Sequence, residues 1–411
     1  MTKTSTEKKQ KQNPTHPEIT IINQQYPPEP ASTGQIFCAI AENFARHGWR
    51  TTVVTGDPYY PGMTEKPPRR ETRNGVSVRR LWNTKFPKSS LAGKLFNLIT
   101  FELSLFFYCL FRIGRNETVL VGTAPPLAVF CAALGKKLRG YRVYLTVQDL
   151  YPDVLKSSGM SDGTGFTYRF LHRVMGRSMR RCDAVASLSR EMCAHLQKEY
   201  GLPEVRLIPN FFPEAIEPLP RGEAKAARGW DGKLVVQYSG NFGVAHEYQT
   251  LLGAARLLRD EPVLFQITGA GSNYFKLKAA CEQEGLSNVV FEGYAPASEL
   301  ERHLSTADLS VVIFSAAFQN VLLPSKYYGI LASGRGTLLI SSCESDIARD
   351  IDAERVGLRF REGESERIAE ALRALLADDS LLDEMGARAR ALYQARYARE
   401  AVIEQYRAWI D

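Results

Sequence analysis

Two series of alternating strand-like and helix-like segments, separated by one break, constrain the fold of this chain more than any other feature. Short β-branched runs, such as residues 19–23 and 51–55, are followed by amphipathic stretches, the first at about residues 34–47. This alternation is typical of a parallel sheet with helices on both faces. A chain of 411 residues is also longer than one hydrophobic core usually supports. The sequence therefore predicts an α/β protein with two doubly wound, Rossmann-like domains.

The break between the two series lies at residues 209–232, which are dense in Pro and Gly and are interpreted as a linker. We expect an N-terminal domain at residues 18–208 and a C-terminal domain at residues 233–385. Residues 386–411 are predicted to be helices that pack back toward the N-terminal domain. Residues 1–17 are polar and lysine-rich, which indicates a disordered tail rather than a secretion signal. Ligands of doubly wound sheets bind outside the carboxyl ends of the strands, so the two domains should face each other across a cleft.

The net charge of +7 is unevenly distributed. Residues 66–94 are rich in basic side chains, namely Lys66, Arg69, Arg70, Arg73, Arg79, Arg80, Lys85, Lys88 and Lys94. Such an excess favours an anionic lipid surface or a phosphorylated substrate, or else forms a solvated loop. The apolar residues 95–113 follow, with Glu102 in the middle and Arg112 near the end. We interpret them as a core helix or a membrane-surface helix in preference to a membrane span.

Cysteine and histidine spacing exclude two common kinds of site. The seven cysteines form no CxxC pair, which favours free thiols in a reducing cytosol over a disulfide framework. The six histidines show no HExxH spacing, so no metal site is predicted.

Four stretches carry a specific resemblance to a known family. They read QYPPEPASTGQ at residues 25–35, APPLAVF to YLTVQDLYPDVLKSSG within residues 124–159, YSGNFG at residues 238–243, and LPSKYYGILASGR at residues 323–335. In their order and spacing these stretches resemble the family 4 retaining glycosyltransferases of the GT-B architecture. The resemblance is greatest to the bacterial branch that builds O-antigen, capsule and colanic-acid-like polysaccharides. It covers the chain from about residue 19 to residue 411.

Two predicted helix starts are candidates for holding phosphates. Ser32, Thr33 and Gly34 precede the first helix, whose free N–H groups attract anions, although they also suit an ordinary N-cap. Ser325 and Lys326 begin a later helix, where a lysine is electrostatically disfavoured unless it answers a diphosphate. In similar family members this helix start holds the phosphates of the donor. We therefore expect Ser325 and Lys326 to bind the donor together with Gly34, and Ser32 and Thr33 to lie on the acceptor side.

Further donor contacts are predicted where strands of the second series end. Asn241 offers an amide, and Gly243 lets the backbone approach a ligand closely. Gly269 belongs to a GAGS stretch that suits either a tight turn or a phosphate cradle. Tyr294, in a stretch that resembles the base-reading segment of similar enzymes, is expected to stack on the base or else to be buried.

The QDLYPD stretch places Gln148 and Asp149 at the predicted cleft. Gln148 is expected on the acceptor side. Asp149 is a candidate base or a contact to sugar hydroxyls, and we name it with Lys326 as a catalytic residue. Alternatively, Asp149 and Asp153 only cap the next turn.

The chain also departs from the family pattern. Typical members carry two glutamates eight residues apart, and the corresponding positions here are Val321 and Gly329. Many members have an arginine near Asn241 and a lysine soon after it, whereas His246 is the nearest candidate in this chain. These differences place the weight of donor phosphate binding on Lys326.

The resemblance implies transfer of a sugar from a UDP- or GDP-linked donor to a hydroxyl group, with retention of configuration and without a metal or other cofactor. The expected acceptor is a glycan on a polyprenyl diphosphate carrier. The expected location is the cytoplasmic face of the plasma membrane, on its anionic surface, with no nucleic-acid partner. The alternatives are a non-catalytic GT-B partner of another transferase, a nicotinamide-dependent oxidoreductase and a nucleotide-sugar epimerase. No GxGxxG follows the first strand, which argues against the oxidoreductase.

Overall fold

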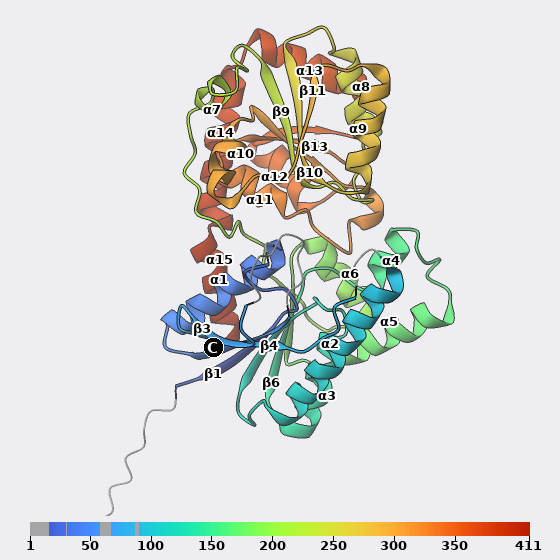
Figure 1. Cartoon of the computed structure of the whole chain (residues 1–411), viewed down its shortest axis with the longest axis vertical. Helices are drawn as coiled ribbons and strands as arrows, with labels where there is room; N and C mark the ends of the chain where they lie inside the picture. The colour runs from blue at the N-terminus through green and yellow to red at the C-terminus, as the bar shows by residue number, and fades with distance from the viewer. Residues whose placement is uncertain (1–15, 30, 58–66, 87–89) are drawn as a thin grey trace, which may run out of the picture.

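The computed structural model describes residues 16–29, 31–57, 67–86 and 90–411. It has two domains, each built on its own sheet, with the N-terminal domain below the C-terminal domain in the view of Figure 1. This arrangement confirms the predicted fold class.

The N-terminal sheet has eight strands in the order β3-β4-β2-β1-β5-β6-β7-β8. These strands are β1 (Glu18–Ile22), β2 (Arg50–Gly56), β3 (Arg70–Arg73), β4 (Val76–Leu81), β5 (Thr118–Gly122), β6 (Arg142–Val147), β7 (Ala184–Ser187) and β8 (Arg206–Leu207). Strand β3 pairs antiparallel with β4, and the other neighbours are parallel. The central strand β1 sets Ile19 beside Thr51 of β2 and Thr118 of β5. The winding direction reverses between β1 and β5, where doubly wound sheets form their ligand crevice.

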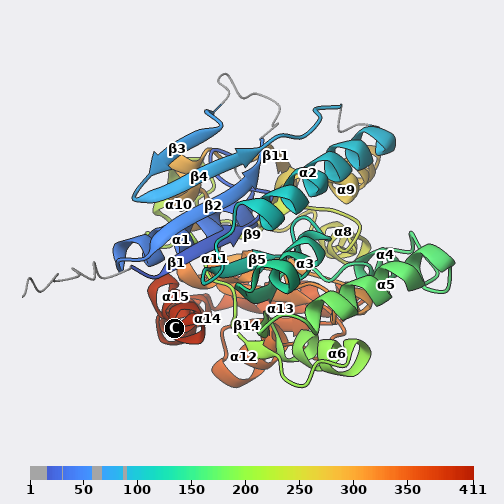
Figure 2. The ribbon, with the colours of Figure 1, turned by 90° about the horizontal axis from the view of Figure 1, so that it is seen from below.

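Helices cover both faces of this sheet. They are α1 (Ser32–Arg46), α2 (Leu91–Phe111), α3 (Ala128–Arg139), α4 (Asp153–Ser157), α5 (Phe166–Met179) and α6 (Arg190–Tyr200). Helices α2, α3, α5 and α6 share one hydrophobic core with the strands, and α1 and the C-terminal helix α15 (Arg399–Ile410) form the other. Helix α3 packs between α2 and α5, and the three lie side by side in Figure 2.

The C-terminal sheet has six parallel strands in the order β11-β10-β9-β12-β13-β14. They are β9 (Leu234–Asn241), β10 (Val263–Ala270), β11 (Val289–Glu292), β12 (Leu309–Ile313), β13 (Gly336–Ile340) and β14 (Gly357–Phe360). The helices are α7 (Glu223–Ala226), α8 (Gln249–Leu257), α9 (Ser272–Glu284), α10 (Leu300–Ser305), α11 (Lys326–Ala332), α12 (Asp346–Glu354), α13 (Ser365–Ala377) and α14 (Ser380–Leu392). Short 3-10 turns lie at η1 (Ala297–Glu299) and η2 (Ala316–Phe318).

Two predicted boundaries are corrected by the structure. The expected linker to residue 232 ends near residue 220, because α7 packs on α10 and Lys225 bonds the buried carboxylate of Asp308 at 2.8 Å. The expected crossing at residue 386 occurs later. Helix α14 stays on the C-terminal domain, where Gly386 lies against the backbone of Gly334, and the chain crosses at the π-helical turn η3 (Tyr393–Tyr397).

Helix α2 is long and apolar enough to cross a membrane by length and composition alone. One side of it belongs to the fold, because Phe101, Leu105 and Cys109 are fully buried in the N-terminal core. Glu102 also faces inward and accepts a hydrogen bond from the Leu127 N–H, at the start of α3, at 2.9 Å. The outer side is exposed and apolar, through Leu95, Phe96, Ile99, Leu103, Phe107 and Phe111.

The basic residues 66–94 do not form one surface. Arg80 is buried and pairs with Glu71 at 2.7 Å, and Lys85 pairs with Asp57 at 3.0 Å. Arg70 and Arg73 lie on β3, at the sheet edge away from α5 (Figure 2). Lys66 and Lys88, like most of the predicted N-terminal tail, lie outside the described residues. Only part of the predicted basic patch is therefore available to a partner on the α2 side.

Candidate functional site

The carboxyl ends of β9 and β10 face the other domain and carry glycines, so the backbone there is not covered by side chains. Gly240 pairs with Gly269 across the two strands, with φ of +128° and +127°. A Cβ on Gly269 would overlap the Gly240 carbonyl oxygen, and one on Gly271 would lie 2.5 Å from the Phe242 carbonyl oxygen. These positions require glycine, both for the left-handed backbone and for the close approach.

Lys326 is the first residue of α11, and its side chain extends toward this bare backbone. Its Nζ lies 3.4 Å from the centroid of the Tyr238 ring and is shielded from solvent. Among the described residues the Nζ has no hydrogen-bond partner. Burial lowers the pKa of the Lys326 amine well below its ordinary value. In the part of the chain that the structure describes, the face of the Tyr238 ring is the one compensating contact of this amine, which is therefore poised to accept an anion.

Aromatic side chains surround the amine. Tyr238 stacks on Phe242 with ring centroids 4.1 Å apart, and His246 meets both rings edge-on. Burial, followed by the nearby Lys326, lowers the pKa of His246 to about 3. His246 is therefore neutral in the unliganded protein, and it does not supply the cation that family members carry near this position.

The remaining predicted donor residues gather around the same strand ends. Asn241 is exposed, and its amide nitrogen lies 3.4 Å from where a Cβ on Gly243 would stand. The Tyr294 ring packs near Gly269 and is 56% exposed, so the alternative that Tyr294 is buried does not hold. Tyr294 also lines a cavity of about 430 Å³ with Arg228, Glu292 and Arg302, among others. Ser325 occupies the N-cap position of α11 without a side-chain capping hydrogen bond.

Lys326 also lines a cavity between the domains, of about 170 Å³. Ser32 and Gln35 of the N-terminal domain contribute to its wall, together with Phe212 and Glu214 of the linker. This volume is below the roughly 300–1,000 Å³ of typical ligand pockets. This cavity alone is therefore too small for a nucleotide-sized ligand.

The start of α1 differs from the prediction. Ser32 and Thr33 are the first helical residues rather than its capping residues, and Ala31 holds the N-cap position without a side-chain hydrogen bond. A Cβ on Gly34 would lie 3.1 Å from backbone atoms of Gln25 and Tyr26. The loop before α1 folds back onto the helix at this glycine, which gives Gly34 a packing role independent of any ligand.

Gln148 and Asp149 follow β6 at the contact between the domains. The buried Gln148 accepts a hydrogen bond from Asn210 at 2.9 Å, and its own Nε2 has no partner among the described residues. Asp149 is exposed, but the surrounding protein partly desolvates its carboxyl group and thereby raises its pKa. The next N–H, of Leu150, donates to the Val321 carbonyl of the C-terminal domain at 2.8 Å.

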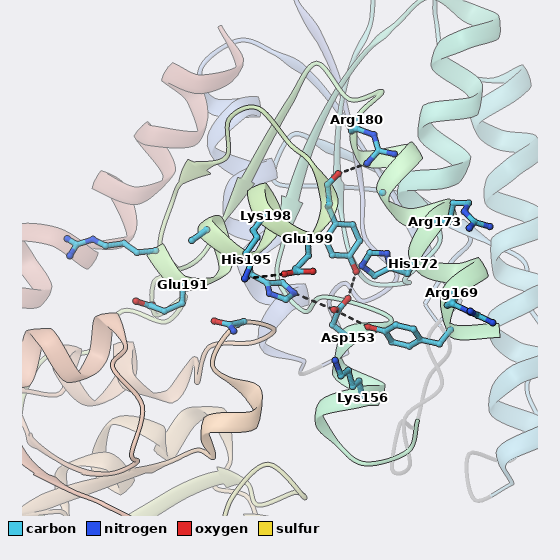
Figure 3. A pocket seen from close by; sticks show the side chains of 16 residues that line it. Asp153, Lys156, Arg169, His172, Arg173, Arg180, Glu191, His195, Lys198 and Glu199 are labelled. Atoms are coloured by element: carbon cyan, nitrogen blue, oxygen red, sulfur yellow. Dashed lines mark hydrogen bonds and ion pairs between the residues drawn. The ribbon is translucent and has the colours of Figure 1, made fainter. Parts of the chain in front are cut away.

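Asp153 has a different role from the predicted cap. Its carboxylate accepts hydrogen bonds from Tyr200 and, at 3.2 Å, from Tyr168, and it contacts His195 at 3.3 Å (Figure 3). Burial alone would raise the pKa of Asp153, but the hydrogen bonds from His195 and Tyr200 outweigh it and lower the pKa. Asp153 thus fastens α4 to α5 and α6.

The structure brings Lys326, Gly269, Asn241, Gly243 and Tyr294 to one region. Ser32 lines the interdomain cavity together with Lys326, whereas Asp149 does not line it. Sequence reasoning missed Tyr238 and Glu214 as site residues. Burial raises the pKa of Glu214, whose position inside the predicted linker gave no periodic signal.

The absent second glutamate has a structural explanation. A Cβ on Gly329 would lie 2.8 Å from the Phe212 ring, so this ring occupies the space that a longer side chain would need. Val321, at the other position, is buried at the domain contact. Glu214, two residues after Phe212, is the carboxylate that remains in this cavity.

Comparison with known proteins identifies the family. Residues 33–210 match the family described as "Glycosyl transferase 4-like domain", and residues 221–392 match "Glycosyl transferases group 1". Over 350 residues the chain is 27% identical to an Escherichia coli (strain K12) protein named as a colanic acid biosynthesis glycosyl transferase, WcaI, covering 81% of this chain and 85% of WcaI. It is 24% identical over 337 residues to the Pseudomonas aeruginosa protein WbjE, named as a glycosyltransferase, covering 79% of this chain and 83% of WbjE.

Among solved structures, Anabaena HepE in complex with UDP-glucose is similar in fold, with a TM-score of 0.67 and 14% identity over 95% of this chain and 98% of HepE. The two matched regions correspond to the two domains of the structure, and together they account for both sides of the interdomain cavity. The chain therefore belongs to the family 4 glycosyltransferases of the GT-B fold, within their exopolysaccharide branch.

Proposed function

We propose that this glycosyltransferase takes a sugar from a nucleoside diphosphate donor, UDP-linked in preference to GDP-linked, and transfers it to a hydroxyl of a lipid-carrier-linked glycan in bacterial surface polysaccharide synthesis. One observation carries the donor assignment. The buried Lys326 amine has no hydrogen-bond partner among the described residues, and it lies beside strand ends whose glycines expose the backbone. A diphosphate would supply the missing charge, and glycines let it approach. The UDP-glucose bound to HepE supports UDP as the carrier.

In the proposed reaction, the bond between the anomeric carbon and the β-phosphate oxygen breaks, and the acceptor oxygen forms a new bond to that carbon. The bonding electron pair leaves with the diphosphate. The charged Lys326 and the backbone N–H groups stabilise this developing negative charge. The acceptor proton passes to the departing phosphate on the same face of the sugar, with retention of configuration. Asp149 is the alternative proton acceptor on the N-terminal side.

A thermal-shift panel tests the donor site. UDP and the UDP-sugar should raise the Tm of the parent in proportion to occupancy, and GDP should do so less. The Lys326→Met variant should lose this rise, while Lys276→Met, at an exposed lysine of α9, should keep it. A parent that no nucleoside diphosphate stabilises would remove the proposal.

We also propose that the exposed outer side of α2 meets the membrane. The exposed apolar residues of this helix are the targets for substitution, and Phe106 is left unchanged because it packs against the core. A variant with Leu95, Phe96, Ile99 and Phe107 changed to serine should no longer float with phosphatidylglycerol vesicles. Flotation equal to that of the parent would contradict the assignment.

The non-catalytic alternative rests on Gly329, where Phe212 leaves no room for a glutamate. If the purified chain hydrolyses the UDP-sugar slowly and Lys326→Met abolishes this hydrolysis, the protein is an enzyme. Nucleotide binding without any turnover, in the presence of an acceptor extract, decides for a supporting subunit.

A further inference from the structure

A second hollow lies on the N-terminal domain, between α4, α5 and α6, and encloses about 1070 Å³ (Figure 3). Six lysines and arginines line this α4–α6 groove against three carboxylates. The basic residues are Lys156, Arg169, Arg173, Arg180, Arg190 and Lys198, and the acidic ones are Asp153, Glu191 and Glu199. The groove shares none of its lining residues with the interdomain cavity.

The carboxylates of the groove are already engaged. Asp153 is held by two tyrosines and His195, and Glu191 pairs with Arg349 of the C-terminal domain. Glu199 lies 3.7 Å from Lys198. Of the remaining cations, Arg190 pairs with Asp346, and Arg180 donates to the Tyr200 carbonyl. In the described part of the chain, the side chains of Lys156, Arg169 and Arg173 have neither an ion pair nor a hydrogen bond. Three positive charges in one concave site therefore lack a partner, and such a site attracts a multiply charged ligand.

Helix α5 sets exposed aromatic rings beside these charges. Phe166, Arg169, Phe170 and Arg173 follow each other at the spacing that places residues on one side of a helix. Phe166 is 78% exposed and Phe170 is 52% exposed, and their rings stack on each other 6.3 Å apart. A soluble polyanion needs no such apolar rim, whereas the hydrocarbon of a lipid does. Helix α5 also lies on the same side of the sheet as α2, whose outer side is apolar.

The α4–α6 groove adjoins the contact between the domains. Asn320 lines the groove and directly precedes Val321, whose carbonyl bonds Leu150 next to Asp149. A ligand whose charged group lies in the groove can thus reach the cleft along residues 149–153.

We propose that the α4–α6 groove binds the diphosphate of the polyprenyl lipid that carries the acceptor glycan, with the first part of the hydrocarbon over Phe166 and Phe170. This inference rests on the proposed lipid-linked acceptor. Arginine pairs two N–H groups with two phosphate oxygens, so Arg169 and Arg173 suit the two phosphates of such a head group. Lys156 supplies the third charge.

The test uses farnesyl diphosphate as a soluble probe of the carrier, measured by calorimetry on the full chain. Farnesyl diphosphate should bind more tightly than inorganic pyrophosphate, and farnesol should not bind. Arg169→Gln with Arg173→Gln should weaken farnesyl diphosphate binding at least tenfold. Phe166→Ser with Phe170→Ser should weaken it without changing pyrophosphate binding. Arg177→Gln, at an exposed arginine of α5 outside the groove lining, is the matched control and should change neither.

Three outcomes would overturn the inference. The arginine double variant could bind farnesyl diphosphate like the parent. An acidic oligosaccharide such as oligogalacturonate could bind as tightly as farnesyl diphosphate and depend on the same arginines, which would assign the groove to a glycan. The double variant could lose only phosphatidylglycerol vesicle binding, which would assign it to bulk lipid. The UDP-induced Tm rise, measured on the same variants, should persist. Its absence in the parent would instead remove the donor proposal.

Discussion

Replacing Lys326 by methionine should stabilise the ligand-free protein and remove its response to UDP. Methionine keeps the length of the side chain and its contact with the Tyr238 ring, but it has no buried amine. An unsatisfied buried donor destabilises a fold by about 1–3 kcal/mol, and the cation–π contact offsets up to about 2 kcal/mol of this. Taking about 2 kcal/mol for the unsatisfied donor and about 1 kcal/mol for the cation–π contact, we expect a net gain of about 1 kcal/mol. For a domain of this size each kcal/mol corresponds to about 2–4 °C in Tm.

The loss of UDP binding can be estimated in the same way. Truncating one partner of a buried, hydrogen-bonded charge pair weakens binding by about 2–5 kcal/mol. UDP at one hundred times its Kd stabilises the parent by about 2.7 kcal/mol. If the variant loses at least 2 kcal/mol of affinity, the same UDP concentration stabilises it by less than about 1 kcal/mol. Differential scanning fluorimetry with and without UDP measures both effects.

The pH dependence supplies an independent check. Because the folded-state pKa of Lys326 is lowered, the unfolded chain binds more protons than the folded one between that pKa and the ordinary value of about 10.4. The destabilisation is complete below the lowered pKa and disappears as the pH rises toward 10.4. The Tm difference between Lys326→Met and the parent should therefore shrink in alkaline buffer. A variant that is less stable than the parent at every pH and keeps the full UDP response would refute the reasoning.

Three further substitutions test other parts of the structure. Burial raises the pKa of Glu102 from 4.5 to about 7, so the folded chain binds more protons than the unfolded chain between these values, and the stability of the parent falls as the pH rises through them. The free energy of unfolding of Glu102→Gln, measured in urea, should therefore rise relative to that of the parent by roughly 2–3 kcal/mol between pH 4 and pH 8. An equal pH slope in both proteins would contradict this. Glu214→Gln should lower kcat/KM about 10–100-fold through loss of a charged hydrogen bond while the Tm does not fall, and unchanged kinetics would exclude Glu214 from the site. Gly269 has a φ of +127°, and a Cβ there would overlap the Gly240 carbonyl, so Gly269→Ala should lower the free energy of unfolding by at least about 1–3 kcal/mol. Gly293→Ala, where a Cβ would meet no atom, is the control in thermal unfolding.

The parallel strands were predictable because their burial leaves a direct trace in the sequence. Residues 142–147 and 309–313 are strands as expected, since strands covered on both faces read as short apolar runs. Strand β3 was missed because its sequence, RETR, is polar and lies at the sheet edge. Helix α5 was also not predicted as a separate element.

Features that depend on distant partners could not be predicted. The linker ends early because the buried carboxylate of Asp308 recruits Lys225, 83 residues away. The groove between α4 and α6 combines charges from separate helices, none of which forms a conspicuous local run. Within the candidate site, the glycines and Lys326 carried a local signal. The Phe212 ring that fills the space beside Gly329 did not, because only the folded chain brings the two together.

The polypeptide passes between the domains twice, once before Pro220 and once at the π-helical turn η3. The two passages are fastened to each other, because Arg399 donates to the Pro213 carbonyl at 2.9 Å and Tyr393 to the Phe212 carbonyl at 3.5 Å. We therefore expect the two passages to move together as one hinge, about which the C-terminal domain rotates. Phe212 and Glu214 belong to that hinge and to the wall of the cavity. A rotation that opens the cavity would then also move the side chains of Phe212 and Glu214. Ligand entry and the geometry of the site are therefore coupled.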